Sequence, residues 1–194
     1  MTPGFILLAA GRATRFGGNK MLARLPLTDT SVIETTLKNI PSDYPRLTIC
    51  RPDQLQLITC LKTLNEPYLA TAPDSSLLGD SISTAVRHTA QWGGWIICLG
   101  DMPWVTPDTY REVLVNLTHK NIVIPRITIE NHHQRGNPVG FGKEYAEQLK
   151  NLAGKTGGKE ITNQHRNSIH FLETKDKGIL LDIDYPDDIK LNPM

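Results

Sequence analysis

A basic, glycine-bearing loop near the N-terminus is the part of this chain best suited to chemistry. It runs from Gly11 to Lys20, follows the apolar run Phe5–Ala10, and carries Arg12, Arg15 and Lys20. Glycine lets backbone N–H groups approach an anion closely, and Arg and Lys neutralise the anion's charge. A buried strand that leads into such a loop is how α/β proteins present N–H groups and cations to phosphate. We therefore expect a phosphate-binding loop here.

Two common phosphate motifs do not describe this loop. The sequence G-x-x-x-x-G-K-[ST] is absent, because Lys20 lies between Asn19 and Met21. The sequence G-x-G-x-x-G is absent too, which removes the main support for a dinucleotide-binding site. What remains is L-A-A-G-x-x-x-R-x-G-x-x-K, whose defining positions include Gly11, Arg15, Gly17 and Lys20.

Two groups of carboxylates are candidates for holding a metal. Asp101 follows the apolar run Trp95–Leu99, so we expect it at the end of a central strand. Asp182 and Asp184 have alternate spacing and would share one face if the run Ile179–Asp182 continues as a strand. Chemistry on a triphosphate usually needs Mg²⁺, which takes one or two protein carboxylates. We expect Asp101 and Asp184 to be the principal ligands, with Asp182 a weaker candidate.

Strand-like and helix-like segments alternate along the chain, which predicts an α/β protein with a mostly parallel sheet covered on both faces. The expected strands are 5–10, 47–50, 68–70, 95–99, 122–125 and 179–182, and the expected helices are 31–40, 80–89 and 107–117. The segment from Ile122 to Gly142 is expected to form a β excursion, and Asn151–Lys159 a flexible loop. No linker divides residues 1–194, so we expect one domain. Ligands of such sheets bind outside the carboxyl ends of the strands.

Composition excludes several classes of partner. A net charge of +1 does not favour nucleic acid or an anionic membrane surface, and no apolar run is long enough to span a membrane. Three cysteines without metal-ligand spacing, and no leader-like N-terminus, lead us to expect the cytoplasm. The pair His132-His133 lies in a polar segment without partners at zinc spacing, so no histidine is expected to act as a base or a ligand.

Four motifs in order give the chain a family resemblance. They are L-A-A-G-x-x-x-R-x-G-x-x-K, then G-D-M-P, then R-G-N-P-V, then D-I-D-x-P-D-D. Together they resemble the molybdenum cofactor cytidylyltransferases and the wider group similar to molybdopterin guanylyltransferase. The resemblance implies a three-layer α/β/α, Rossmann-like nucleotidyltransferase fold. It also implies a Mg²⁺-dependent transfer of CMP from CTP to molybdopterin, whose product would pass to a molybdoenzyme or its chaperone.

The resemblance assigns roles to individual residues. Arg15, Lys20 and Asp101 would be catalytic, and Asp101, Asp184 and Asp182 would hold the metal. The nucleotide would be bound by Ala9, Ala10, Gly11, Arg15, Gly17, Lys20, Gly79, Ser81 and Ser83. The acceptor would be bound by Arg135, Gly136, Asn137 and Pro138. Alanine at position 10, where the guanylyl branch more often has glycine, favours cytosine over guanine.

Departures from the family pattern leave the acceptor open. Lys155 stands where members often have an acid, Thr14 replaces a frequent arginine, and Tyr185 replaces a usual threonine. Guanylyl transfer to molybdopterin and transfer to a sugar or alcohol phosphate are therefore alternatives within the class. A non-catalytic nucleotide or cofactor carrier is a further alternative, against which the retained Lys20, Asp101 and Asp184 argue.

Overall fold

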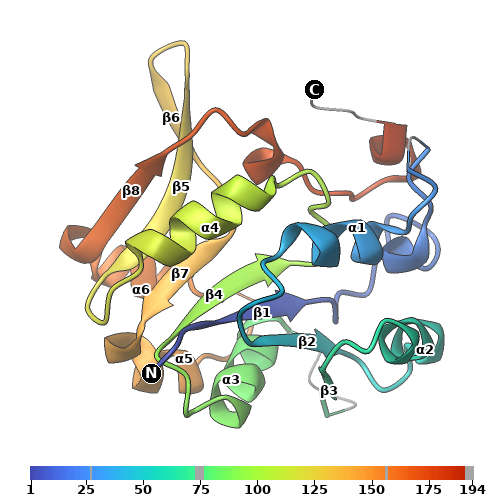
Figure 1. The fold of residues 1–194 in the computed structure, drawn as a ribbon, viewed down its shortest axis with the longest axis horizontal. Coiled ribbons are helices and arrows are strands. Elements are labelled where there is room, and N and C mark those ends of the chain that lie inside the picture. The colour runs from blue at the N-terminus through green and yellow to red at the C-terminus, as the bar shows by residue number, and fades with distance from the viewer. Residues whose placement is uncertain (27, 73–76, 156, 191–194) are drawn as a thin grey trace.

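The computed structural model describes residues 1–26, 28–72, 77–155 and 157–190 of the chain, and a single mixed sheet of eight strands forms its centre (Figure 1). The strand order is β3-β2-β1-β4-β7-β5-β6, and β8 pairs with β5. The strands are β1 (Gly4–Leu8), β2 (Arg46–Cys50), β3 (Tyr68–Ala70), β4 (Gly94–Leu99), β5 (Ile122–Ile129), β6 (His132–Arg135), β7 (Val139–Gly142) and β8 (Ile169–Glu173). Strands β3, β2, β1 and β4 run parallel, whereas β7 is antiparallel to both β4 and β5.

Helices cover both faces of the sheet, as the alternating pattern predicts. The helices are α1 (Val32–Asn39), α2 (Leu55–Thr63), α3 (Leu78–His88), α4 (Pro107–Asn116), α5 (Ala146–Lys150) and α6 (Lys159–Gln164). Phe5 and Leu7 of β1 pack with the apolar side chains of α1, α2 and α4. Ile6 and Leu8 point the other way and pack with those of α3, α5 and α6. The expected three-layer α/β/α arrangement is confirmed.

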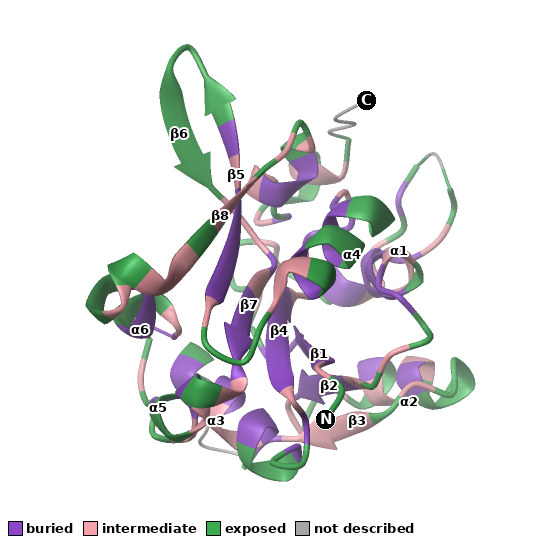
Figure 2. Ribbon diagram, turned by 60° about the vertical axis from the view of Figure 1, so that its left-hand side comes forward, coloured by how far each residue is buried: buried purple, intermediate pink, exposed green. Residues whose placement is uncertain are grey.

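The β excursion is a hairpin that projects from the sheet. Residues 126–129 of β5 pair with residues 132–135 of β6. All of β6 and the last two residues of β5 are exposed (Figure 2). The chain then returns as β7 between β4 and β5. His132 and His133 lie on this exposed hairpin, and the Thr128 hydroxyl lies 2.9 Å from Nδ1 of His133.

The expected strand at Ile179–Asp182 is wrong. The segment Lys177–Leu180 is a short 3₁₀ helix, η4, because the Asp176 carboxylate accepts a hydrogen bond from the Gly178 N–H at 2.9 Å and caps it. Gly178 also lies so close to the Trp104 carbonyl that no side chain would fit between them. The strand that completes this side of the sheet is β8, which pairs with residues 122–126 of β5.

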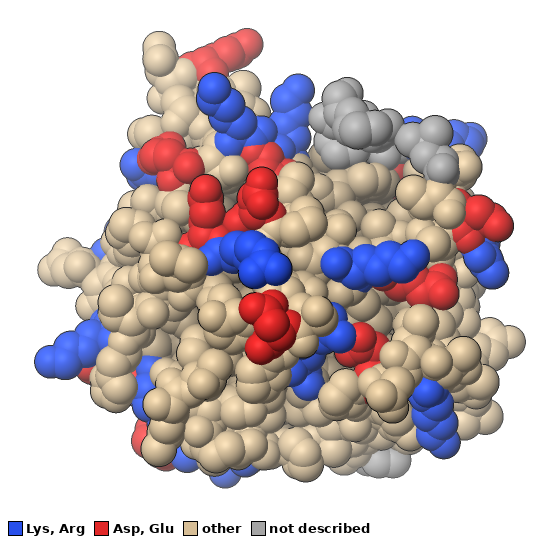
Figure 3. Space-filling model, in the orientation of Figure 1, with Lys and Arg blue, Asp and Glu red and all other residues tan. Residues whose placement is uncertain are grey.

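No helix among the described residues is long and apolar enough to cross a membrane. On the face shown in Figure 3, basic and acidic side chains are interspersed and no broad patch of one sign is present. This pattern agrees with the near-neutral net charge of the chain.

A capping box fixes the start of α1. The Ser31 hydroxyl accepts a hydrogen bond from the Glu34 N–H at 3.3 Å, and the Glu34 carboxylate accepts one from the Ser31 N–H at 2.7 Å. These bonds satisfy donors that a helix start leaves open. Hydrogen bonding to Ser31, by its side chain first and its backbone N–H second, lowers the pKa of the Glu34 carboxyl group. Further along α1, the Thr36 hydroxyl donates to the Gly100 carbonyl at 3.1 Å and so ties the helix to the end of β4.

Replacing the cap tests its contribution to the fold. Ser31→Ala should lower the free energy of unfolding by about 1 kcal/mol, which for a chain of this size corresponds to a Tm roughly 2–4 °C lower. Ser42→Ala, at an exposed position just after α1, is the control and should leave Tm unchanged. Equal Tm values for both variants in thermal melts would show that the capping box does not stabilise α1.

Candidate active site

The carboxyl ends of β1 and β4 lie side by side and bring the two principal motifs together. Leu8 of β1 is in register with Leu99 of β4, and the Gly100 N–H donates to the Leu8 carbonyl at 2.9 Å. The basic loop begins directly after β1, and Asp101 follows β4 by two residues. The expectation that both motifs meet at one edge of the sheet is confirmed.

Lys20 and Asp101 form the central ion pair of this edge. The Lys20 ammonium lies 2.6 Å from Oδ2 of Asp101 and 3.5 Å from Oδ1 of Asp184, and its side chain is only 9% exposed. Arg15, from the same loop, places Nη1 2.8 Å from Oδ2 of Asp184. Lysine is rarely this buried without a partner, so the position of Lys20 depends on the carboxylates. The structure thus places both predicted loop cations against the predicted metal ligands.

The three aspartates form one cluster although the expected strand is absent. The Ile183 N–H donates to the Asp101 carbonyl at 2.9 Å, and the Ile183 side chain is fully buried. This anchor leaves Asp182 and Asp184, on either side of Ile183, next to Asp101. One ligand oxygen from each aspartate lies within 4.8 Å of the others, and no other such group of three occurs among the described residues.

The carboxylate of Asp188 helps to hold the cluster in shape. Its Oδ2 accepts hydrogen bonds from the Asp184 N–H at 2.8 Å and the Tyr185 N–H at 2.6 Å. These bonds fix the turn that carries Asp184 into the 3₁₀ helix η5 (Pro186–Lys190). Asp188 therefore caps the turn and supports the position of Asp184.

The electrostatics of the cluster favour a cation. Burial of the Asp182 carboxyl group raises its pKa, and the negative charges of Asp101 and Asp184 raise it further. Carboxylate oxygens are the donors that hard divalent cations prefer. The ammonium of Lys20 already lies between two of the three aspartates, which shows that a positive charge is accommodated there. The residues present therefore fit a divalent metal.

The basic loop keeps open space beside its glycines. A Cβ built on Gly11, Gly17 or Gly18 would meet no atom within 4 Å. Gly17 has φ +73°, a left-handed conformation that side chains rarely adopt, so glycine is required at that position. Ala9 and Ala10 are buried at the start of the loop, whereas Gly11 is exposed.

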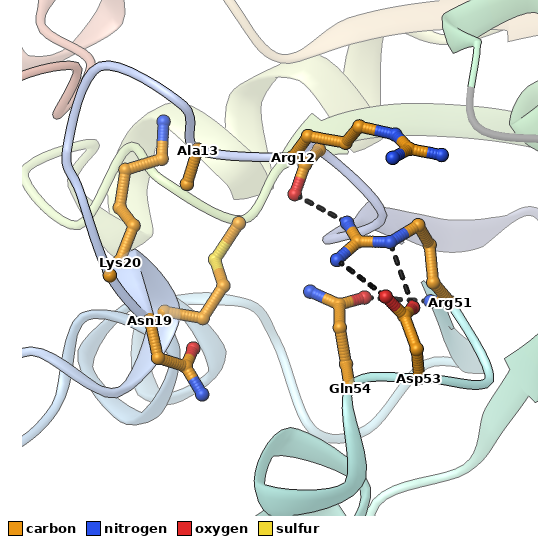
Figure 4. Close-up of a pocket in the computed structure, with 10 residues that line it drawn as sticks. Arg12, Ala13, Asn19, Lys20, Arg51, Asp53 and Gln54 are labelled. Carbon is orange, nitrogen blue, oxygen red and sulfur yellow. Dashed lines mark hydrogen bonds and ion pairs between the residues drawn. The ribbon is translucent and has the colours of Figure 1, made fainter.

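A small polar pocket of about 220 Å³ lies between the loop and the residues that follow β2 (Figure 4). Arg51, Asp53 and Gln54 line it and were not predicted as functional residues. The available signal is their place directly after β2, at the same edge of the sheet as the basic loop.

The predicted nucleotide-binding residues Gly79, Ser81 and Ser83 lie in α3, which packs against α5 and the segment that follows it. The Gly79 N–H donates to the Gly154 carbonyl at 2.8 Å, and a Cβ at Gly79 would lie 2.8 Å from the Ala153 backbone. Ser81 is buried, and the Ser83 hydroxyl donates to the Lys150 carbonyl at 2.5 Å. These contacts join two helices, so the structure does not bring the Ser83 hydroxyl to the aspartate cluster.

The predicted acceptor stretch lies beside a larger cavity of about 760 Å³. Arg135, Gly136 and Asn137 line it, whereas Pro138 is buried and is not among its lining residues. Its floor is apolar and includes Leu8, Ile97, Leu99 and Phe141, and its cationic side chains are Arg135, Lys155 and Lys159. Thr156 of the loop after α5 lies outside the described residues. Lys155 is the residue that departs from the family pattern, and Lys159 was not predicted as a site residue.

Comparison with family models gives a match to the MobA-like NTP transferase domain over residues 5–169. The chain belongs to this family. It is therefore a nucleotidyltransferase, in agreement with the resemblance inferred from its motifs. Comparison with curated protein sequences gives no significant match.

Solved structures similar to this family member share its fold. Rv0371c from Mycobacterium tuberculosis H37Rv, in complex with manganese, has a TM-score of 0.77 at 23% identity over 98% of this chain and 97% of that one. Molybdopterin-guanine dinucleotide biosynthesis protein A from Archaeoglobus fulgidus has a TM-score of 0.67 at 20% identity over 96% and 95%. CMP:2-keto-3-deoxy-manno-octonic acid synthetase, complexed with CTP, has a TM-score of 0.79 at 9% identity over 98% and 96%.

The repulsion within the aspartate cluster can be measured as stability. In metal-free buffer at pH 7, Asp182→Asn should raise Tm by a small amount, about 1–2 °C, because it removes one of three like charges that solvent screens only partly. Adding a divalent cation should raise the Tm of the wild type and raise that of Asp182→Asn less.

Asp43→Asn is the control. The ion pair of Asp43 with Arg111 is long, at 3.8 Å, and both side chains are exposed, so its loss should hardly change Tm. Thermal melts with and without Mg²⁺ or Mn²⁺ compare the three proteins. A cation-dependent rise in Tm that is equal in all of them would exclude Asp182 as a metal ligand.

Proposed function

We propose that this nucleotidyltransferase transfers CMP from CTP to the terminal phosphate of molybdopterin and releases pyrophosphate. The observation that carries the proposal is the ion pair between Lys20 of the phosphate loop and Asp101 at the end of β4. It joins the group suited to a triphosphate to the group suited to a divalent cation. Mg²⁺ held by Asp101 and Asp184, with Asp182 beside them, would neutralise phosphate charge in this cytoplasmic enzyme.

The transfer needs no general base. A terminal phosphate oxygen of the acceptor is already ionised at neutral pH and attacks the α-phosphorus of CTP. A new P–O bond forms, the bond to the β-phosphate oxygen breaks, and pyrophosphate leaves with its electron pair. Positioning and charge neutralisation are then the main contributions of the protein. Arg15 and Lys20 supply the positive charge, and the N–H groups after Ala9 supply hydrogen bonds to the phosphates.

The larger cavity supports an acceptor with a ring system and an anionic end. Its volume of about 760 Å³ lies within the range of small-molecule sites. The apolar floor suits the faces of flat rings, and Arg135, Lys155 and Lys159 suit phosphate. Molybdopterin combines both features. The charged product would pass to a molybdoenzyme or its chaperone.

Ala10 supports the choice of cytosine. It is 4% exposed and packs with the apolar cluster on the α3 side of the sheet. We expect its Cβ to reduce the room for a base at the start of the loop, and a pyrimidine needs less room than a purine. One of the similar structures holds CTP, whereas another acts in making a guanine dinucleotide. We expect position 10 to separate the two specificities.

Asp101→Asn tests the catalytic assignment. The substitution removes the charge that faces Lys20 and the candidate metal. We expect turnover to fall by a factor of about 100 or more, as for loss of a group that stabilises transition-state charge. Circular dichroism is expected to show an unchanged fold. A folded variant that keeps more than about a tenth of wild-type turnover, a barrier change below ~1.4 kcal/mol, would remove Asp101 from catalysis.

Base choice is tested by pyrophosphate release from each of the four nucleoside triphosphates with purified molybdopterin. CTP should give the highest kcat/KM, with GTP lower by about 10–200-fold. Ala10→Gly should shift this ratio toward GTP, because it removes the Cβ that limits room for a purine. A wild type that prefers GTP would reject the cytidylyl assignment, whereas an unchanged ratio in the variant would reject only the role of Ala10. The same assay with sugar phosphates as acceptors tests the alternative that the enzyme transfers the nucleotide to a sugar phosphate.

A further inference from the structure

Side chains that follow β2 hold three consecutive carbonyl groups at the start of the phosphate loop. Gln54 Nε2 donates to the Ala9 carbonyl at 3.0 Å. Arg51 Nη1 donates to the Ala10 carbonyl at 2.7 Å and to the Gly11 carbonyl at 2.7 Å. One short segment outside the loop thus determines the orientation of three successive peptide groups within it.

The donors are themselves fixed in place. Asp53 binds the Arg51 guanidinium through Oδ1 to Nε at 2.9 Å and through Oδ2 to Nη2 at 3.4 Å (Figure 4). Gln54 Oε1 accepts the Arg51 N–H at 2.7 Å, and the Arg51 side chain is only 13% exposed. We call Arg51, Asp53 and Gln54 the carbonyl clamp. A planar guanidinium held on two sides is a rigid set of donors.

The clamp determines where the loop N–H groups point. In a trans peptide group, the carbonyl of one residue and the N–H of the next point in opposite directions. Carbonyls turned toward the clamp therefore turn the N–H groups of Ala10, Gly11 and Arg12 away from it. None of these three N–H groups donates to an acceptor among the described residues. Successive N–H groups left open in this way form an anion-binding surface.

Direct binding of phosphate by Arg51 is not favoured by this geometry. A guanidinium has five N–H donors. Nη1 already donates to two carbonyls, and Nε and Nη2 donate to Asp53. At most one donor is left for a ligand. The space beside Gly11, where a Cβ would meet no atom within 4 Å, lies instead next to the oriented N–H groups.

We propose that Arg51, fixed by Asp53 and Gln54, is a positioning residue for nucleotidyl transfer. It holds the carbonyls of Ala10 and Gly11 so that the loop N–H groups face the phosphates of the nucleoside triphosphate. This inference rests on the proposed function, because it takes the loop as the triphosphate site. Its consequence is that loss of Arg51 weakens triphosphate use without removing any group that touches the triphosphate.

The structure supplies a matched control in Arg46, at the other end of β2. Arg46 Nη1 also donates to two backbone carbonyls, those of Leu37 and Ile40, at 3.2 and 3.3 Å. It also pairs with a carboxylate, that of Glu66. The two arginines therefore have the same kind of structural contacts, but only Arg51 acts on the phosphate loop. A purely structural role would give both substitutions the same kinetic effect.

The experiment measures Tm, kcat and the KM for the preferred triphosphate in wild type, Arg51→Ala, Arg51→Lys and Arg46→Ala. Arg51→Ala should raise KM about tenfold or more, because misplaced binding groups are costly even when they remain present. Arg51→Lys, which keeps a cationic donor, should recover part of the loss, and added methylguanidinium should partly restore Arg51→Ala. Arg46→Ala should lower Tm but leave KM within about twofold of the wild type.

The possible results distinguish failure of the positioning role of Arg51 from failure of the proposed function. If Arg51→Ala is folded at the assay temperature and its KM stays within twofold of wild type, the inference is wrong while the proposed transfer stands. Equal rises in KM for Arg51→Ala and Arg46→Ala would also overturn it, because the effect would then follow general loss of structure. A wild type that releases pyrophosphate from no triphosphate would reject both the inference and the proposed function.

Discussion

The repulsion among three aspartates is the constraint on which the active edge depends. Asp101, Asp182 and Asp184 bring ligand oxygens within 4.8 Å of one another, which is unfavourable for carboxylates without a nearby cation. The Lys20 ammonium offsets part of this charge at 2.6 Å from Asp101, and Arg15 offsets part from the solvent side. The basic loop is therefore held against the sheet by the same charges that suit it to phosphate. Removing either side of this network would leave the other side destabilised.

The surrounding backbone fixes the two sides of the network independently. Strand β4 delivers Asp101, and the buried Ile183 joins the C-terminal segment to the Asp101 carbonyl. On the other side, the 3₁₀ helix η1 (Lys20–Leu22) places Lys20, and α1 packs against η1. Because backbone contacts fix both the aspartates and Lys20, the charged groups are held in place by the fold. Such pre-organisation is what charge stabilisation in a transition state requires.

The central sheet could be predicted from sequence because its strands are short, apolar and followed by glycine or a turn. The strands at the N-terminus, around Ile49 and before Asp101 follow this rule, and their shared edge follows from parallel pairing. Strand β8 was missed because exposed His170 and Glu173 interrupt its apolar pattern. The cluster of aspartates was predicted for the wrong reason. Asp182 and Asp184 meet Asp101 because Ile183 is bonded and buried between them, not because a strand presents both on one face.

The carbonyl clamp is a different kind of omission. Its bonds to the loop carbonyls join residues 40, 41 and 45 positions apart, and side chains that bond to backbone carbonyls leave no recurring spacing in a sequence. Helix α2 was missed for a related reason, since Gln54 at its start makes no capping bond and uses its side chain on the loop instead. A side chain that bonds to a distant carbonyl does not form the local capping bonds by which helix starts are predicted from sequence. Functional supports of this type become visible only when the sheet has brought the segments together.

The charge balance of the active edge also bears on how a triphosphate and a divalent cation would affect each other's binding. Arg15 and Lys20 pair with a cluster of three carboxylates, so these five side chains together carry a net negative charge before any ligand arrives. A triphosphate would compete with Asp101 and Asp184 for the same ammonium and guanidinium groups. A divalent cation at the aspartates would reduce that competition, because it would release Lys20 and Arg15 to the phosphates. By linkage, each of the two ligands would then increase the affinity for the other. On the proposed function, the ion pairs between loop and cluster would therefore couple the binding of the triphosphate to the binding of the metal.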